Sequence, residues 1–269
     1  MGADGDDMHE HPLRVDISAG TATLTLNRAQ AGNAIDLPTA EALVAAAVRC
    51  EADESIRCVV LTGVGRLFCG GGDMAALAAA GDHLPEVLSE LVGALHTAVS
   101  KLMRMRKPLL VLVNGPAAGA GLSLAVMGDV VLAVRSAHFS AAYGAVGLTA
   151  DGGLSWHLPR LIGLRRAQEM MLTNRRVTAE EADEMGLVTR VVDDDALTSE
   201  GAALAQRLAG SATLAIGGAR TLLLESFGGG LEAQLDREAR SMIRAGATRD
   251  GREGIAAFLA RRKPVFAGN

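Results

Sequence analysis

The sequence predicts an α/β protein with a parallel sheet, followed by a helical C-terminal region. Two observations carry this prediction. Short apolar runs typical of strands alternate with helical segments up to residue 195, and no convincing strand follows. With 269 residues, 49% of them hydrophobic, the chain can bury a substantial core. We expect a disordered acidic tail over residues 1–11, an α/β core over residues 12–195 and a helical region over residues 196–269.

The predicted core begins with a hairpin. Residues 13–17 and 21–26 flank Ala19 and Gly20, and in the second arm threonines alternate with apolar residues, the period of a half-buried strand. A helix is predicted over residues 37–52, because apolar side chains recur at helical spacing and Pro38 suits the first turn of a helix.

The rest of the core is predicted from three apolar runs and the segments between them. Residues 58–61, 109–113 and 130–134 fit buried strands, and residues 86–105 and 118–127 fit helices. Strands that alternate with helices imply βαβ units with parallel strands and right-handed crossovers.

The C-terminal region is predicted to contain helices only. Its helical segments are residues 202–208, 212–224, 231–243 and 252–260.

Composition and charge exclude several classes of function. A net charge of -5 and a pI near 5.7 argue against nucleic-acid binding, which needs clustered positive charge. Cys50, Cys58 and Cys69 are odd in number and lack zinc-site spacing, so we expect reduced thiols in a cytoplasmic protein. No apolar stretch reaches the roughly 18 residues of a membrane span.

Two glycine-rich segments each follow a predicted strand and precede a helix. They are "FCGGGDM", from Phe68 to Met74, and "NGPAAGAG", from Asn114 to Gly121. The dinucleotide fingerprint fails because Phe68 stands where its third glycine belongs, and no Gly-Lys-Ser/Thr completes a phosphate loop. A serine nucleophile elbow also fails, because Ser123 falls inside the predicted helix rather than on the turn.

Two such junctions can instead aim two backbone N–H groups at one carbonyl oxygen, forming an oxyanion hole. Either motif alone is explained equally well by glycines that permit tight turns or close packing.

Several motifs occur together in an order and spacing that resemble the enoyl-CoA hydratase/isomerase (crotonase) superfamily. They are "LNR" with Asn33 and Ala34, "VVLTGVGRLFCGGGDM", "KPLLVLVNGPAAGAG", "GLTADGGLSWHLPRLIGLRRA", "LTNRRVTAEEADEMGLVTRVV" and "EGIAAFLARRKPVF". The resemblance implies the crotonase fold, a ββα spiral core with a C-terminal helical trimerisation region, and assembly as a homotrimer or dimer of trimers. It implies an acyl-CoA substrate that brings its own CoA, and no metal or redox cofactor.

The resemblance also implies roles for particular residues. Gly72 and Ala120 would donate the oxyanion-hole N–H groups, and Tyr143 would contact the substrate. The thioester and pantetheine path would be lined by Gly70, Asp73, Met74 and Ala75, and the CoA adenine end approached by Arg28, Ala29 and Ala31. Phe258 and Arg261 match positions that contact CoA, often across a subunit boundary, although Phe258 could equally belong to the core.

The reaction depends on acids and bases near the acyl chain. Hydratases of the superfamily use two glutamates, and this chain has Ser123 and Tyr143 at those positions. Asp151 matches the aspartate of several isomerase members, including ring-epoxide phenylacetyl-CoA isomerases. We therefore expect an isomerisation through an enolate with Asp151 as acid and base. The alternative role of Asp151 is to cap the helix that follows.

Other functions use the same residues. In 4-chlorobenzoyl-CoA dehalogenases an aspartate at the position of Asp151 attacks the aromatic ring and a histidine, near the position of His96, activates water. Aromatic residues form only 3% of the chain, fewer than an aryl pocket normally needs, and His96 could simply lie on a helix surface. A non-catalytic acyl-CoA binder and a weak hydratase that uses water and Asp151 remain as further alternatives.

Overall fold

The structure is a computed structural model that describes residues 11–269, so nearly all of the predicted tail lies outside the described residues. The strands are β1 Leu13–Ser18, β2 Thr21–Leu26, β3 Cys58–Gly63, β4 Leu109–Val113, β5 Ala117–Ala118, β6 Val130–Val134, β7 His138–Ser140, β8 Val177–Thr178 and β9 Arg190–Val192. The α-helices are α1 Leu37–Ala52, α2 Met74–Ala79, α3 Leu84–Arg104, α4 Ala120–Val126, α5 Leu154–Ile162, α6 Leu164–Thr173, α7 Ala179–Glu184, α8 Leu197–Ala209, α9 Thr213–Glu225, α10 Leu231–Ala247 and α11 Arg249–Leu259.

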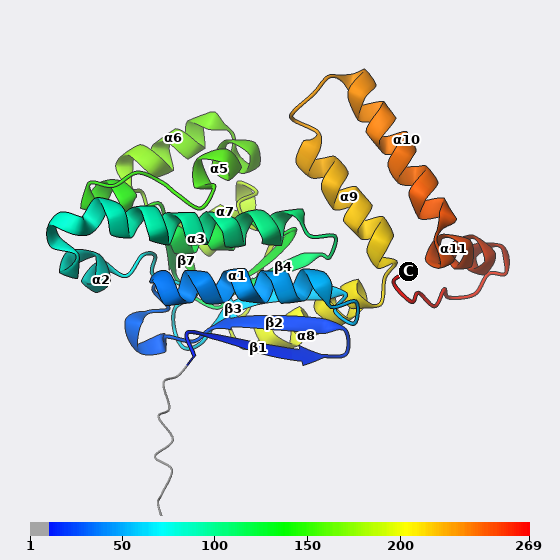
Figure 1. Ribbon diagram of the computed structural model, residues 1–269, viewed down its shortest axis with the longest axis horizontal. Helices are drawn as coiled ribbons and strands as arrows, with labels where there is room; N and C mark the ends of the chain where they lie inside the picture. Colours follow the sequence, from blue (N-terminus) through cyan, green and yellow to red (C-terminus); the bar gives the residue numbers. More distant parts are fainter. Residues whose placement is uncertain (1–10) are drawn as a thin grey trace, which may run out of the picture.

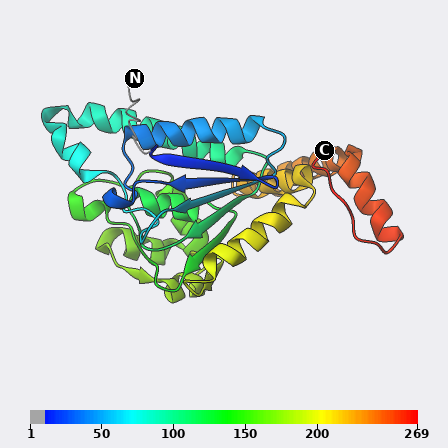
Figure 2. The same cartoon turned by 90° about the horizontal axis from the view of Figure 1, so that it is seen from below.

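The main sheet has six strands in the order β1-β2-β3-β4-β6-β9, and a smaller sheet has the order β5-β7-β8. The hairpin of β1 and β2 is antiparallel, whereas β2, β3, β4, β6 and β9 pair in parallel. Helices α1 and α3 pack together on one side of the main sheet, and α8 covers the other side (Figures 1 and 2). The predicted α/β class with parallel strands is confirmed.

The boundaries differ from the predicted ones where the chain bends. The helix predicted over residues 118–127 begins two residues later, because Gly119 has a left-handed φ of 52° and Ala118 pairs in β5. The short strands β5, β7, β8 and β9 and the short helices α2 and α7 were not predicted, since two- to six-residue elements carry little periodicity. The ten-residue helix α6 was not predicted either.

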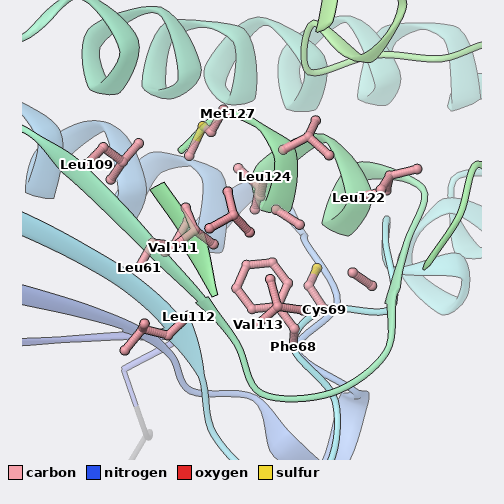
Figure 3. Packing of buried hydrophobic residues seen from close by; sticks show 14 of the residues in the cluster. Leu61, Phe68, Cys69, Leu109, Val111, Leu112, Val113, Leu122, Leu124 and Met127 are labelled. Atoms are coloured by element: carbon pink, nitrogen blue, oxygen red, sulfur yellow. The ribbon is translucent and has the colours of Figure 1, made fainter. Parts of the chain in front are cut away.

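The segment that leads to the first glycine loop is fixed in the core. Phe68 and Cys69 have no exposed surface, and Figure 3 shows them packed beside Val113 of β4 and near Leu122 of α4. Burial raises the pKa of the Cys69 thiol to about 12, so this cysteine is a small apolar residue here. The loop therefore leaves the core from a rigid base.

Helices α9, α10 and α11, with the final residues, form a C-terminal arm that projects from the core (Figures 1 and 2). Its base is tied down by Arg57, which donates to the carbonyl oxygens of Phe266 at 2.9 Å and Ser211 at 2.6 Å. Phe258 on α11 is 82% exposed, so the alternative that it is a core residue is wrong. No helix among the described residues is both long and apolar enough to span a membrane.

Candidate active site

The two glycine loops lie against each other. A Cβ atom added to Gly71 would lie 3.0 Å from the carbonyl oxygen of Ala118, and one added to Gly119 would lie 3.6 Å from the Cα of Gly71. Gly71 has a φ of 108° and Gly119 a φ of 52°, conformations that L side chains rarely adopt. Glycine is therefore favoured at both positions by backbone conformation, and at Gly71 by space as well.

Each loop leaves one backbone amide free. Within residues 11–269, neither the N–H of Gly72 nor that of Ala120 donates to a protein acceptor. Ala120 is the first residue of α4, whose N-terminal N–H groups carry partial positive charge. Both residues border the same cavity. This arrangement is suited to binding a carbonyl oxygen on which negative charge develops.

The cavity has a volume of about 330 Å³ and apolar walls. It is lined by both glycine loops and by several residues between positions 142 and 151. The apolar lining residues are Ile35, Met74, Leu77, Leu88, Leu91, Val92, Leu95, Val146 and Leu148. Among the described residues, Asp151 is the one carboxylate that lines it.

Asp151 is held by a hydrogen-bond cluster with Tyr143 and Ser123. The Tyr143 hydroxyl donates to Asp151 Oδ1 at 2.6 Å. Ser123 Oγ lies 3.1 Å from the Tyr143 hydroxyl and 3.0 Å from the Asp151 carbonyl oxygen, and its single proton can be donated to either of them. Asp151 Oδ2 accepts no hydrogen bond from any described residue. Tyr143 thus holds the Asp151 carboxylate, and Ser123 contacts both the Tyr143 hydroxyl and the backbone of Asp151.

Tyr143 is kept protonated by its surroundings. Burial first, and then the negative charge of Asp151, raise the pKa of its hydroxyl well above the ordinary value. The hydroxyl is therefore a hydrogen-bond donor to the carboxylate and not a base.

The capping role considered for Asp151 is wrong. Helix α5 starts at Leu154 with Gly153 at its N-cap, and no side chain caps it. Only the backbone carbonyl of Asp151 takes part, by accepting the N–H of Leu154 at 3.1 Å.

His96 lies on an exposed part of α3 and also borders the cavity. Its Nε2 accepts the backbone N–H of Gly152 at 3.0 Å. The lone pair of Nε2 is therefore already used in a hydrogen bond to Gly152, the residue that follows Asp151 in the chain. His96 supports the loop that carries Asp151, whether or not it has a second role.

Arg28 and Asp73 are engaged with the protein. Arg28 Nη2 lies 2.9 Å from Asp73 Oδ2 and 3.1 Å from Asp36 Oδ2. Asp73 also caps α2, accepting the N–H groups of Ala75 and Ala76 at 3.1 Å. The pKa of its carboxyl is lowered first by the Ala76 N–H and then by Arg28. These two side chains join the first loop to the chain that follows β2.

The other residues of the predicted CoA path divide into two groups. Gly70 and Met74 line the cavity, and Ala75 follows them on the exposed start of α2. Ala29 and Ala31 lie on an exposed 3₁₀ turn near this loop. Phe258 and Arg261 lie in the C-terminal arm, at the other end of the molecule from α2 (Figures 1 and 2). Within one chain they do not reach the cavity.

Two features of the site were not predicted. The first is the wall contributed by α3, whose Leu88, Leu91 and Leu95 repeat at helical spacing and could have indicated an apolar face. The second is the contact of Tyr143 with Asp151, which no sequence pattern signals.

Comparisons with known proteins agree with this geometry. Residues 16–269 match the Enoyl-CoA hydratase/isomerase family. The chain is 37% identical to the 1,2-epoxyphenylacetyl-CoA isomerase of Escherichia coli K12, over 94% of this chain and 97% of that protein. It is 32% identical to 4-chlorobenzoyl coenzyme A dehalogenase-2 of an Arthrobacter species, over 87% of this chain and 85% of that protein.

Solved structures give the same result. The crystal structure of an enoyl-CoA hydratase from a Polaromonas species superposes with a TM-score of 0.90 at 34% identity, covering 94% of this chain and 99% of that one. The family match spans the strands, both glycine loops and the helical C-terminal region. The chain therefore belongs to the enoyl-CoA hydratase/isomerase (crotonase) family, and its fold is the crotonase fold.

Proposed function

We propose that this acyl-CoA enzyme isomerises a double bond or strained ring of an acyl-CoA thioester through an enolate, with Asp151 as the acid and base. The observation that carries the proposal is the composition of the cavity. Two unpartnered amides and one carboxylate face an apolar space, and Asp151 is the one carboxylate lining it among the described residues.

The proposed reaction begins with the thioester carbonyl oxygen between the N–H groups of Gly72 and Ala120. Asp151 Oδ2 removes a proton from the acyl chain, and the C–H electron pair moves into the thioester to give an enolate oxygen. The two amides stabilise this charge, and each contributes about 3–4 kcal/mol to the transition state. The protonated Asp151 then returns its proton to another carbon, so the double bond has moved and the mass is unchanged.

Hydration is the less favoured reaction on chemical grounds. Adding water needs one group to activate the water and another to protonate carbon. Ser123 and Tyr143 cannot serve as that pair, because neither is a carboxylate and Tyr143 retains its proton. The proposed isomerisation needs one group that can both take and return a proton, which a single aspartate provides.

A dehalogenase-type hydrolysis is the second candidate. It is favoured by His96, which borders the same cavity as Asp151, and by the Arthrobacter relative named above. It requires His96 to accept a proton from water, yet Nε2 already accepts the Gly152 N–H. Tyr143 is also the one aromatic residue lining the cavity among the described residues. Both observations favour isomerisation.

The C-terminal arm supports a proposed trimer or dimer of trimers. Its exposed apolar residues include Phe227, Leu231, Met242, Ile243 and Phe258, each more than 60% exposed. A surface of this kind normally packs against another subunit. Such packing would bring Phe258 and Arg261 to a neighbouring cavity, where they could contact CoA. No metal or redox cofactor is part of the proposed reaction.

A panel of acyl-CoA esters tests the proposal. We expect 3-enoyl-CoA or ring-epoxide acyl-CoA esters to be converted without a change of mass but with a change of ultraviolet absorbance. Asp151→Asn should lower the rate by about 10²- to 10⁴-fold, while the matched surface variant Asp195→Asn should not. A mass gain of one water on crotonyl-CoA would contradict the proposal. Loss of halide from a halobenzoyl-CoA ester, abolished in His96→Gln, would favour the second candidate.

A further inference from the structure

We infer that Tyr143 is a positioning residue for proton transfer, which holds one oxygen of Asp151 so that the other faces the substrate. The inference rests on the proposed function and assigns to Tyr143 a role other than substrate contact. Its basis is the hydrogen bond at 2.6 Å from the Tyr143 hydroxyl to Asp151 Oδ1, together with the unpartnered Oδ2.

The position of Tyr143 is set by an unusual backbone conformation at the preceding residue. Ala142 adopts a left-handed φ of 60°, which is uncommon for a residue other than glycine, and Tyr143 then starts a 3₁₀ turn. The Tyr143 carbonyl oxygen accepts the N–H of Leu148 at 3.0 Å, so the turn closes before Asp151. Two segments eight residues apart are thus brought to hydrogen-bonding distance inside the cavity wall.

The second contact fixes the tyrosine itself. Ser123, which is fully buried in α4, lies 3.1 Å from the Tyr143 hydroxyl. Its Cβ also lies 2.7 Å from the Cβ that a side chain at Gly152 would add, so the loop approaches α4 closely at this point. The hydroxyl is therefore held from one side by α4 and directed at the carboxylate on the other.

This geometry has a consequence for the reaction. A carboxylate that is free to rotate offers either oxygen to the substrate, whereas one oxygen held by a neutral donor leaves a single basic atom. The donor also stabilises the charged carboxylate between turnovers. The proton moves only between substrate carbon and Asp151 Oδ2, and the Tyr143 O–H bond is not broken.

The test uses exchange of the Cα proton of butyryl-CoA in deuterium oxide, followed by mass spectrometry. This reaction reports enolate formation without requiring the natural substrate. We expect Tyr143→Phe to lower the exchange rate by about 10- to 100-fold, because a hydrogen bond to a charged group is lost. The dissociation constant of butyryl-CoA should change by less than about twofold, because the hydroxyl acts on the carboxylate and not on substrate binding.

Three controls keep the result interpretable. Thr173→Val removes an exposed hydroxyl outside the site and should change nothing. Ser123→Ala removes the support of Tyr143 and should lower the exchange rate in the same direction by a smaller factor, which provides a second route if Tyr143→Phe folds poorly. The thermal midpoint of each variant separates loss of fold from loss of rate.

A spectroscopic measurement tests the contact directly. Tyr143 is the single tyrosine of the chain, so tyrosinate absorbance reports on this residue alone. Because the charge of Asp151 helps to raise the pKa of Tyr143, Asp151→Asn should let the tyrosine ionise at lower pH. A Tyr143→Phe variant that exchanges the Cα proton at the wild-type rate would overturn the inference.

Failure of the proposed function gives a different result from failure of the positioning role alone. In that case the wild-type protein itself exchanges no proton, and the positioning role fails with it. When only the inference fails, the wild type exchanges normally and Tyr143→Phe matches it.

Discussion

The proposed thioester side and the proposed acid–base side of the cavity are held in place by different means. On the proposed thioester side, Gly71 and Gly119 face each other and the unpartnered amides of Gly72 and Ala120 border the cavity, so the groups proposed to act are peptide N–H groups. On the acid–base side, Asp151, Tyr143 and Ser123 are held by side-chain hydrogen bonds. The first half depends on the close fit of the backbone, and the second on the identity of three side chains.

This difference explains why the proposed thioester side can serve many reactions, whereas the proposed acid–base side is specific to one reaction. A peptide N–H is available at any residue that can adopt the backbone conformation, so alanine at position 120 is compatible with the proposed role. The proposed acid–base side depends on side chains, which substitutions change, and related proteins carry both isomerase and dehalogenase names.

The largest expected effect comes from Gly121, which lies under both loops. A Cβ atom added here would lie 2.1 Å from the carbonyl oxygen of Cys69, so Gly121→Ala must displace the first loop. We expect the free energy of unfolding to fall by about 3 kcal/mol or more. The variant should show no detectable exchange of the Cα proton of butyryl-CoA. Gly93→Ala is the matched control, because a Cβ atom there meets nothing within 4 Å. Equal stability of the two variants would show that the loops do not depend on this close contact.

Gly71→Ala tests the conformation of the first loop itself. The positive φ and the 3.0 Å approach to Ala118 predict a shifted amide at Gly72 and a rate about 10²-fold lower, as when one oxyanion donor is lost. Gly163→Ala has a similar positive φ but no neighbour within 4 Å, so it should cost some stability and leave the rate unchanged. If both variants lose activity equally, backbone strain and not the oxyanion hole is responsible.

The stability of the protein should also depend on pH through His157, a buried residue in the first turn of α5 that lies close to Gly153. Burial, and then the charge of Arg160, lower the pKa of His157 to about 4. The unfolded chain, with an ordinary histidine pKa of about 6.5, binds more protons between these two values, so stability falls as the pH decreases from about 6.5 to 4. We expect a loss of about 2 kcal/mol between pH 7 and 4.5, measured by urea unfolding.

His157→Gln should reduce that pH dependence, whereas His83→Gln, at an exposed histidine, should leave it as it is. A wild-type free energy of unfolding that is flat over this range would contradict the burial of a neutral imidazole at His157.

The smallest expected effect is that of Ser123→Ala, which leaves Tyr143 and Asp151 in contact. We expect the exchange rate to fall by about two- to fivefold, less than the effect of removing the Tyr143 hydroxyl itself. A larger loss than in Tyr143→Phe would mean that Ser123, and not the tyrosine, fixes the carboxylate. Exchange kinetics of the two variants, measured side by side, decide between them.

The same contrast governs what could be predicted from the sequence. The buried strands and the two glycine loops carry local signals, so the parallel sheet and the two strand–glycine–helix junctions could be anticipated, whereas the choice of Gly72 and Ala120 within the loops came from the family resemblance. The contact of Tyr143 with Asp151 could not, because it depends on the left-handed backbone at Ala142 and the 3₁₀ turn that follows. The engagement of Arg28 by Asp36 and Asp73 is likewise a tertiary contact between distant segments. Such contacts leave no periodic trace in the sequence.

The central claim is that Asp151 forms an enolate in this cavity, and proton exchange tests it most directly. Wild-type protein and Asp151→Asn are each incubated with butyryl-CoA in deuterium oxide, and incorporation of deuterium at Cα is followed by mass spectrometry. The asparagine can still accept the Tyr143 hydrogen bond, so the site keeps its shape while losing its base. We predict exchange by the wild type and a rate about 10²-fold or more lower in Asp151→Asn, with unchanged butyryl-CoA binding. Exchange by Asp151→Asn at the wild-type rate would contradict the claim.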